Sequence, residues 1–218
     1  MTGPTVRWMK ERSSAGGYAL CGSLIIGGEG KFFNRMIFVT PEGEVTFYDK
    51  RHLHSVSGEH TAYSRGNKRV VVSYREFSFN LQVCYDLRFP VWSRNRGDTD
   101  VIIYSANWPA VRSSVWKALL VARAIENQCY VIGVNRVGEN PDGTTYTGDS
   151  AIIGPRKRDT CLGRSPRTAL LKVLAQHCSP WNRLRNIGLK CPSGASPSFR
   201  ADLVNDSAQS YQAVGSRQ

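Results

Sequence analysis

Apolar and polar residues follow regular periods over the first 155 residues of this 218-residue chain. Alternation with a period of two is typical of strands, and apolar residues three or four apart are typical of helices. The pattern predicts helices over residues 5–16, 90–96 and 112–127. It predicts strands over residues 18–26, 31–40, 44–50, 68–74, 76–84, 101–105 and 130–137, and a last element over 146–153. Hairpins followed by β-α-β units indicate an α/β protein built as a layered sandwich with helices outside.

The strand predicted over residues 76–84 ends in a cysteine. Its apolar side chains fall on one face, and the period breaks at Cys84, where the backbone turns. A nucleophile needs this position, because it must reach a pocket while its backbone is held rigidly. A cysteine at the end of a strand is also commonly a small buried hydrophobic residue. The position alone leaves both interpretations open.

Charge and composition divide the chain near Pro155. The formal net charge is +12, and most of it falls in residues 156–218, where 11 Lys and Arg stand against 3 Asp and no Glu. We therefore expect a folded domain over residues 1–155 and a basic tail rich in Ser, Pro and Arg over residues 156–218. The tail could be a native arginine-rich extension, or the coding sequence could leave its frame near Pro155, and both possibilities stay open.

The basic charge does not by itself indicate a partner. A sequence pI near 9.7 is common among nucleic-acid-binding proteins. No motif that reads RNA or DNA accompanies the charge, so nucleic acid is not expected as a partner. The chain has no apolar run of about 18 residues and no signal-peptide pattern, which predicts a cytoplasmic protein and no membrane.

The sequence also gives no sign of a metal or another cofactor. It has no Cys-x-x-Cys pair and no histidine cluster with metal-ligand spacing, so no metal is expected. Cys21, Cys84 and Cys129 are widely spaced, which argues against a disulfide framework. The glycine-rich residues 27–30 fit a hairpin turn better than a phosphate-binding loop.

Three motifs carry a family resemblance. They are Tyr48-Asp-Lys-Arg-His-Leu53, Cys84-Tyr-Asp-Leu-Arg-Phe-Pro90 and Tyr104-Ser-Ala-Asn-Trp-Pro109. With further matching pieces in family order up to Pro155, the chain resembles the nitrilase (carbon–nitrogen hydrolase) superfamily, and most closely its bacterial omega-amidase-like branch. The resemblance implies a nitrilase-type α-β-β-α sandwich, incomplete at both ends in this chain, and pairing of two copies across a helical face into a homodimer.

The resemblance also implies a chemistry. Cys84 would attack the carbonyl of a small-molecule amide, with an omega-amide of a short dicarboxylic acid favoured, and form a thioester. Lys50 and the backbone N–H of Tyr85 would stabilise the oxyanion. Glu59 is similar to the family's auxiliary glutamate, and Trp108 is similar to a residue of the pocket wall.

For three of these residues the sequence also allows an ordinary structural role. Lys50 could be a solvated cation beside Asp49 and Arg51. Glu59 could be a plain loop carboxylate, and Trp108 could be a core aromatic residue.

The family's general-base glutamate has no counterpart in this chain. In the family it lies in a Pro-Glu segment that precedes these motifs, whereas this chain opens on the helix predicted over residues 5–16. Without that base we expect impaired catalysis, since general-base help is typically worth a factor of about 10² to 10⁴. Two alternatives remain: a non-catalytic binding protein with the nitrilase fold, and a fragment produced by gene calling.

Overall fold

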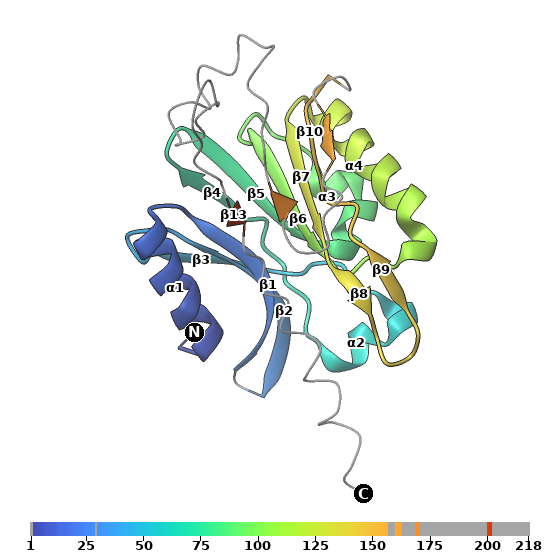
Figure 1. Cartoon of the computed structure of the whole chain (residues 1–218), viewed down its shortest axis with the longest axis horizontal. Coiled ribbons are helices and arrows are strands. Elements are labelled where there is room, and N and C mark those ends of the chain that lie inside the picture. The colour runs from blue at the N-terminus through green and yellow to red at the C-terminus, as the bar shows by residue number, and fades with distance from the viewer. Residues whose placement is uncertain (1, 29, 157–159, 163–168, 171–199, 202–218) are drawn as a thin grey trace, which may run out of the picture.

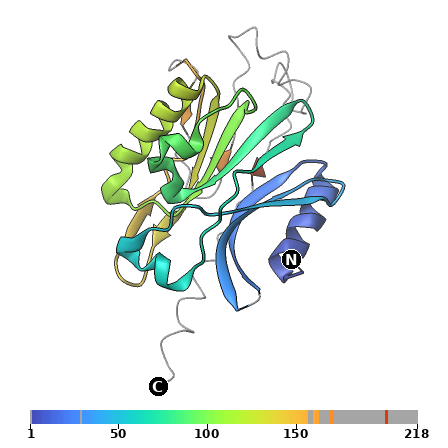
Figure 2. The ribbon, with the colours of Figure 1, turned by 180° about the vertical axis from the view of Figure 1, so that it is seen from behind.

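The computed structural model describes residues 2–28, 30–156, 160–162, 169–170 and 200–201. These residues form four layers, in which two β-sheets face each other and helices cover the outer faces (Figures 1 and 2). The predicted α/β class and α-β-β-α sandwich are therefore confirmed. Most of the basic tail predicted over residues 156–218 lies outside the described residues.

The first sheet is antiparallel, with the strand order β1-β2-β3. It consists of β1 (Leu20–Gly28), β2 (Lys31–Val39) and β3 (Val45–Asp49), and α1 (Pro4–Gly16) lies on its outer face. The first two strands form a tight hairpin in which Gly28 pairs with Lys31. Gly30 adopts φ +72°, a left-handed conformation that glycine tolerates without strain. The hairpin turn predicted over residues 27–30 is therefore confirmed.

The second sheet has the strand order β11-β10-β7-β6-β5-β4. Its strands are β4 (Val71–Tyr74), β5 (Phe77–Val83), β6 (Val101–Ala106), β7 (Tyr130–Asn135), β10 (Ala151–Ile153) and β11 (Thr160–Leu162). The helices of this half are α3 (Pro90–Ser93) and α4 (Ser113–Asn127). The strands β5, β6 and β7 are parallel, so their carboxyl ends meet at one edge of the sheet. This edge carries the site described below.

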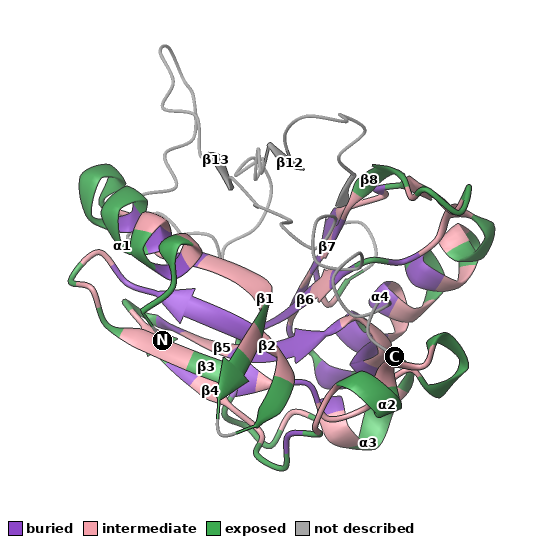
Figure 3. Ribbon diagram, turned by 90° about the horizontal axis from the view of Figure 1, so that it is seen from below, coloured by how far each residue is buried: buried purple, intermediate pink, exposed green. Residues whose placement is uncertain are grey.

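The layers follow from the two faces of β2. Ile37 and Val39 pack against α1, in a cluster with Val6 and Met9. Met36 and Phe38 face the second sheet and pack there with side chains of β5. The final residues of β2 are all buried because both faces of this strand are covered, and Figure 3 shows the buried stretch between α1 and the second sheet.

The outer face of the second sheet is covered by α4. Trp116 and Leu120 are fully buried against β7, in a third apolar cluster. The fit at β7 is close, because a Cβ added at Gly133 would lie 2.5 Å from Leu120 Cδ1 and 2.8 Å from Trp116 Cζ2. Gly133 therefore lets this helix approach the sheet.

The structure differs from the predicted elements mainly where the elements are short. The pattern did not predict η1 (Ser55–Ser57), α2 (Glu59–Ala62), η2 (Cys84–Arg88), η3 (Ala110–Arg112), β8 (Val137–Glu139), β11, β12 (Ala169–Leu170) or β13 (Arg200–Ala201). The element predicted over residues 146–153 is split into β9 (Thr145–Thr147) and β10. Gly148 and Asp149 adopt φ +75° and +56°, which interrupts an extended strand.

In the part of the chain that the structure describes, no helix combines the length and apolar character needed to cross a membrane.

The close packing at β7 gives a stability prediction. We expect Gly133→Ala to lower the free energy of unfolding by about 1–3 kcal/mol, because the new methyl group overpacks the contact with α4. Gly28→Ala is the matched control in a strand, since nothing lies within 4 Å of its added Cβ. Urea denaturation of both variants checks the prediction. Equal stability of the two variants would contradict it.

Candidate active site

The carboxyl end of β5 presents Cys84 in a strained turn. Cys84 is the first residue of η2 and adopts φ +45°, which is uncommon for a residue other than glycine. Its side chain is half-buried, and Sγ lies 4.0 Å from the carbonyl oxygen of Asn107, just beyond the end of β6. The predicted position of the cysteine at a sharp turn after the strand is therefore confirmed.

Lys50 reaches the same edge of the molecule from the other sheet. It directly follows β3, and its side chain is only 3% exposed. Its backbone N–H donates to the carbonyl of Asn34 at 2.9 Å, and its own carbonyl accepts from the N–H of Gly66 at 3.0 Å. These bonds fix the backbone that carries the ammonium group. Lys50 is thus buried, and the interpretation as a solvated cation is wrong.

Glu59, the first residue of α2, neutralises Lys50. Both carboxylate oxygens accept from Lys50 Nζ, at 2.6 and 2.8 Å. The carboxylate also accepts from Asn34 Nδ2 at 3.0 Å and from the backbone N–H of His54 at 2.7 Å. Burial alone would raise the pKa of Glu59, but the charge of Lys50 and these hydrogen bonds outweigh it, and the pKa lies below its ordinary 4.5. Glu59 is therefore an ionised partner of the lysine rather than a free loop carboxylate.

The electrostatics of Cys84 are set by opposing influences. Burial raises the pKa of the thiol most, the charge of Lys50 lowers it, and the charges of Glu59 and Asp86 raise it further. The net result is a pKa above the ordinary value of 9.0. The thiol is therefore protonated at neutral pH, and attack by the thiolate requires a group that removes the proton.

The two carboxylates that act on Cys84 are already occupied. Glu59 is bonded as described above. Asp86 is fully buried and accepts four hydrogen bonds, from Tyr48, from the N–H of Val83 and from both the N–H and the ring of His52. Glu59 and Asp86 are the described carboxylates whose charges act on the Cys84 thiol. Because both are held by these hydrogen bonds, neither is free to take the proton of the thiol.

Tyr85 and Trp108 flank these groups. The Tyr85 ring packs edge-on against His54 and Phe89, with ring centroids 4.8 and 5.2 Å apart. The Trp108 side chain is 4% exposed and contacts Trp116 in the third apolar cluster, against which Cys84 also packs. Trp108 thus lies near the cysteine while forming part of the core, and its role in a pocket wall stays a prediction.

Polar residues outside the predicted set complete the arrangement. Asn135, at the end of β7, accepts from the N–H of Trp108 at 2.7 Å and donates to its carbonyl at 3.0 Å. Sequence reasoning also missed Asn34, Asp86 and Tyr48, whose hydroxyl donates to Asp86. Asp86 lies in the sequence between the apolar residues Val83 and Leu87. A charged residue in such a context is expected to have dedicated partners, and this was the signal that could have identified it.

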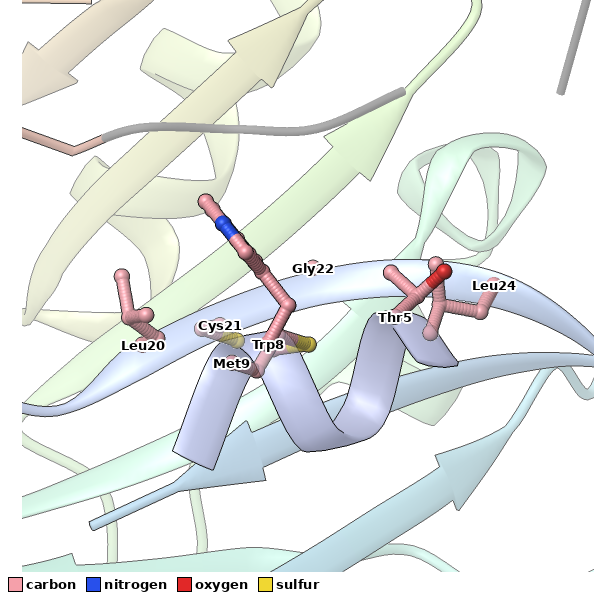
Figure 4. Close-up of a pocket in the computed structure, with 7 residues that line it drawn as sticks. All are labelled: Thr5, Trp8, Met9, Leu20, Cys21, Gly22 and Leu24. Carbon is pink, nitrogen blue, oxygen red and sulfur yellow. The ribbon is translucent and has the colours of Figure 1, made fainter. Parts of the chain in front are cut away.

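A hollow elsewhere in the fold is separate from this site. Figure 4 shows it between α1 and β1, lined by Thr5, Trp8, Met9, Leu20, Cys21, Gly22 and Leu24. Its volume of about 10 Å³ leaves room for at most one water molecule. It contains none of the predicted site residues. Across the described ranges, no group of three or more His, Cys, Asp or Glu side chains could hold a metal ion.

The Lys50–Glu59 pair gives a prediction that depends on pH. We expect Glu59→Gln to lower the free energy of unfolding at pH 7 by about 3–5 kcal/mol, because it leaves a buried ammonium without its counter-charge. Since folding lowers the pKa of Glu59, its contribution is complete above pH 4.5 and is lost as the pH falls through the folded value.

The difference between the native chain and Glu59→Gln should therefore shrink in acid. Urea denaturation at several pH values between 3 and 7 measures it. Glu44→Gln serves as the control, since Glu44 is an exposed glutamate. A difference that stays constant over the whole range would contradict the prediction.

Comparisons with known proteins identify relatives of this chain. Residues 1–168 match the sequence model of the family described as carbon-nitrogen hydrolase. The chain is 50% identical over 151 residues to the omega-amidase YafV of Escherichia coli (strain K12), covering 69% of this chain and 59% of that protein. It is 36% identical over 152 residues to the 2-oxoglutaramate amidase of Bacillus subtilis (strain 168), covering 68% and 58%.

A solved structure shows the same fold. The crystal structure of XC1258 from Xanthomonas campestris, a CN-hydrolase superfamily protein with an arsenic adduct in the active site, matches with a TM-score of 0.72 at 42% identity. The match covers 76% of this chain and 66% of that one, so the chain spans less than two thirds of each of these relatives. The resemblance found in the motifs is confirmed: the chain belongs to the carbon–nitrogen hydrolase (nitrilase) superfamily, in its omega-amidase-like branch.

Proposed function

We propose that the site around Cys84 is built for cysteine-dependent hydrolysis of a small-molecule amide. One observation carries the proposal. A half-buried cysteine in a strained turn lies at the same edge of the molecule as a buried lysine from the opposite sheet. The charge of that lysine acts on the thiol and is fixed by Glu59. A buried cation beside a nucleophile stabilises the thiolate and the oxyanion that follows.

The reaction has two steps. The thiolate Sγ of Cys84 forms a bond to the amide carbonyl carbon, and the Lys50 ammonium and the Tyr85 N–H stabilise the oxyanion. The C–N bond then breaks, and ammonia leaves with a proton. Water next attacks the thioester carbon, the C–S bond breaks, and a carboxylate and the free thiol remain. Both steps need a base, first for the thiol and then for the water.

The favoured substrate is an omega-amide of a short dicarboxylic acid. The support comes from relatives whose names state such activities, an omega-amidase at 50% identity and a 2-oxoglutaramate amidase at 36%. No cofactor enters this chemistry. The reacting groups are side chains and one backbone N–H of the chain itself.

We further propose that turnover by this chain is impaired. Glu59 and Asp86 already accept hydrogen bonds from fixed partners, and the thiol has a raised pKa. Loss of general-base help typically costs a factor of about 10² to 10⁴. The same observation favours a second candidate, a protein that keeps the fold and binds partners without turnover.

We also propose a cytoplasmic homodimer that pairs across the helical face. Exposed apolar side chains on α3 and α4 support this pairing, since Val91 is 79% and Ile125 is 45% exposed. Burial of such side chains between two copies is the usual stabilisation of a dimer.

Ammonia release from succinamate and glutaramate tests the activity. We expect turnover on the order of 10⁻³ to 10⁻¹ per second, which is a typical enzyme rate lowered by the proposed loss of general-base help. Cys84→Ala should abolish it, while Cys129→Ala, which changes a cysteine outside the site, should not. Added hydroxylamine should divert the thioester to a hydroxamate.

Two results would decide against parts of the proposal. A rate near 10 per second, typical of enzymes, would contradict the impairment. A folded protein that gives neither ammonia nor hydroxamate would favour the non-catalytic candidate.

Thiol labelling tests the state of the cysteine. Cys84 should react with iodoacetamide far faster than Cys129, because Cys129 is buried and burial raises its pKa to about 12. The rate at Cys84 should keep rising with pH beyond 9, since its thiol ionises above the ordinary value of 9.0. Mass spectrometry of each cysteine peptide measures both rates. A plateau below pH 9, or equal rates at the two cysteines, would contradict this.

A further inference from the structure

A buried polar connection joins the two sheets beside the reacting pair. Asp86 lies two residues after Cys84 in η2, and Tyr48 lies two residues before Lys50 in β3. Both side chains are fully buried, and the Tyr48 hydroxyl donates to Asp86 Oδ2 at 2.8 Å. The bond thus connects the strand that leads to the lysine with the turn that presents the cysteine.

Asp86 makes this connection from both of its oxygens. Oδ2 also accepts from the N–H of Val83 at 3.1 Å, which fixes the turn at the end of β5. Oδ1 accepts from the N–H of His52 at 3.0 Å and lies 2.7 Å from Nδ1 of the same residue. The carboxylate therefore bonds the backbone on both sides of the gap, one residue before Cys84 and two residues after Lys50.

The Tyr48 hydroxyl is fully used as well. It accepts from the N–H of Arg51 at 3.1 Å and from Trp92 Nε1 at 3.0 Å while donating to Asp86. Burial, followed by the charge of Asp86, raises the pKa of Tyr48, which keeps its hydroxyl a donor to the carboxylate. A hydroxyl offers one donor and two acceptor positions, so no position is left open. Such a saturated buried network rigidifies the groups that it joins.

We propose that Asp86 is a positioning residue that fixes the Lys50 ammonium relative to the Cys84 thiol across the gap between the two sheets. It acts through Tyr48 and His52 and contacts no reacting atom. The proposal rests on the reacting pair proposed above. Lys50 and Cys84 come from different sheets, so their separation depends on contacts between the sheets rather than on either strand alone.

The charge and the position of Asp86 act on Cys84 in opposite directions. The negative charge of Asp86 raises the pKa of the thiol, as does that of Glu59, while Lys50 lowers it. If Asp86 acted only as a charge, Asp86→Asn would lower the pKa of Cys84 and speed its alkylation. If Asp86 fixes the lysine near the thiol, the same variant weakens the influence of Lys50 and slows alkylation.

The experiment compares three variants by alkylation with iodoacetamide between pH 7 and 10, without substrate. Trypsin releases residues 76–88, in which Cys84 is the one cysteine, so mass spectrometry follows that thiol alone. We expect Asp86→Asn and Tyr48→Phe to slow alkylation at pH 8, on the order of three- to tenfold, with the profile moved to higher pH. Tyr104→Phe is the matched control, because it removes a buried tyrosine hydroxyl that bonds Ser93 rather than Asp86.

Two results would overturn the proposal. One is unchanged or faster alkylation in Asp86→Asn or in Tyr48→Phe. The other has two parts. The alkylation rates of Cys84 and Cys129 would change by the same factor in Tyr48→Phe and in Tyr104→Phe, and the melting temperature would fall equally in both variants. Such a result would mean that the whole fold is less stable. Tyr48→Phe decides the matter even if Asp86→Asn does not fold. Alkylation needs no turnover, so a protein without amidase activity still gives a clear answer.

Discussion

The arrangement of the site depends on keeping one ammonium group charged in a place that excludes water. The Lys50 side chain is 3% exposed, and an unpaired charge there would cost several kcal/mol. Glu59 supplies the opposite charge at 2.6 Å, and its own burial is compensated by Asn34 and the N–H of His54. The loop from β3 to α2 must therefore fold back on the lysine. The short helix α2 begins with Glu59 and places its carboxylate on the lysine.

This constraint also determines what the cysteine can do. A buried cation stabilises a thiolate, but the carboxylate that keeps the cation in place opposes that effect, and burial of the thiol opposes it further. In the reaction proposed above, the pair therefore favours the charged transition state without ionising the cysteine in advance. The proton of the thiol would then leave as the substrate is attacked. For that reason the identity of the base matters more in this site than in one with a thiolate at rest.

The sequence predicted the parts of the fold that a short-range pattern determines. Alternation placed β2 and β5 correctly, and the break of period at Cys84 marked the strained turn. The pattern could not predict α2, because four residues without an apolar face carry no periodic signal. It joined β9 and β10 into one element. Aspartate is common in many kinds of turn, so its presence at position 149 does not predict the left-handed backbone that separates the two strands.

The candidate site was predictable as a set of residues but not as a geometry. The motifs contain Cys84 and Lys50, and the family resemblance added Glu59, yet nothing in their spacing states that both oxygens of the glutamate bond the lysine. Asp86 and Tyr48 lay inside the same motifs and were missed, since each looks like an ordinary polar residue until the two sheets are stacked. Contacts between sheets are long-range in the sequence, and a pattern along one strand contains no information about its partner across the core. The residues that set the distance between nucleophile and cation are therefore the ones that only a three-dimensional structure can identify.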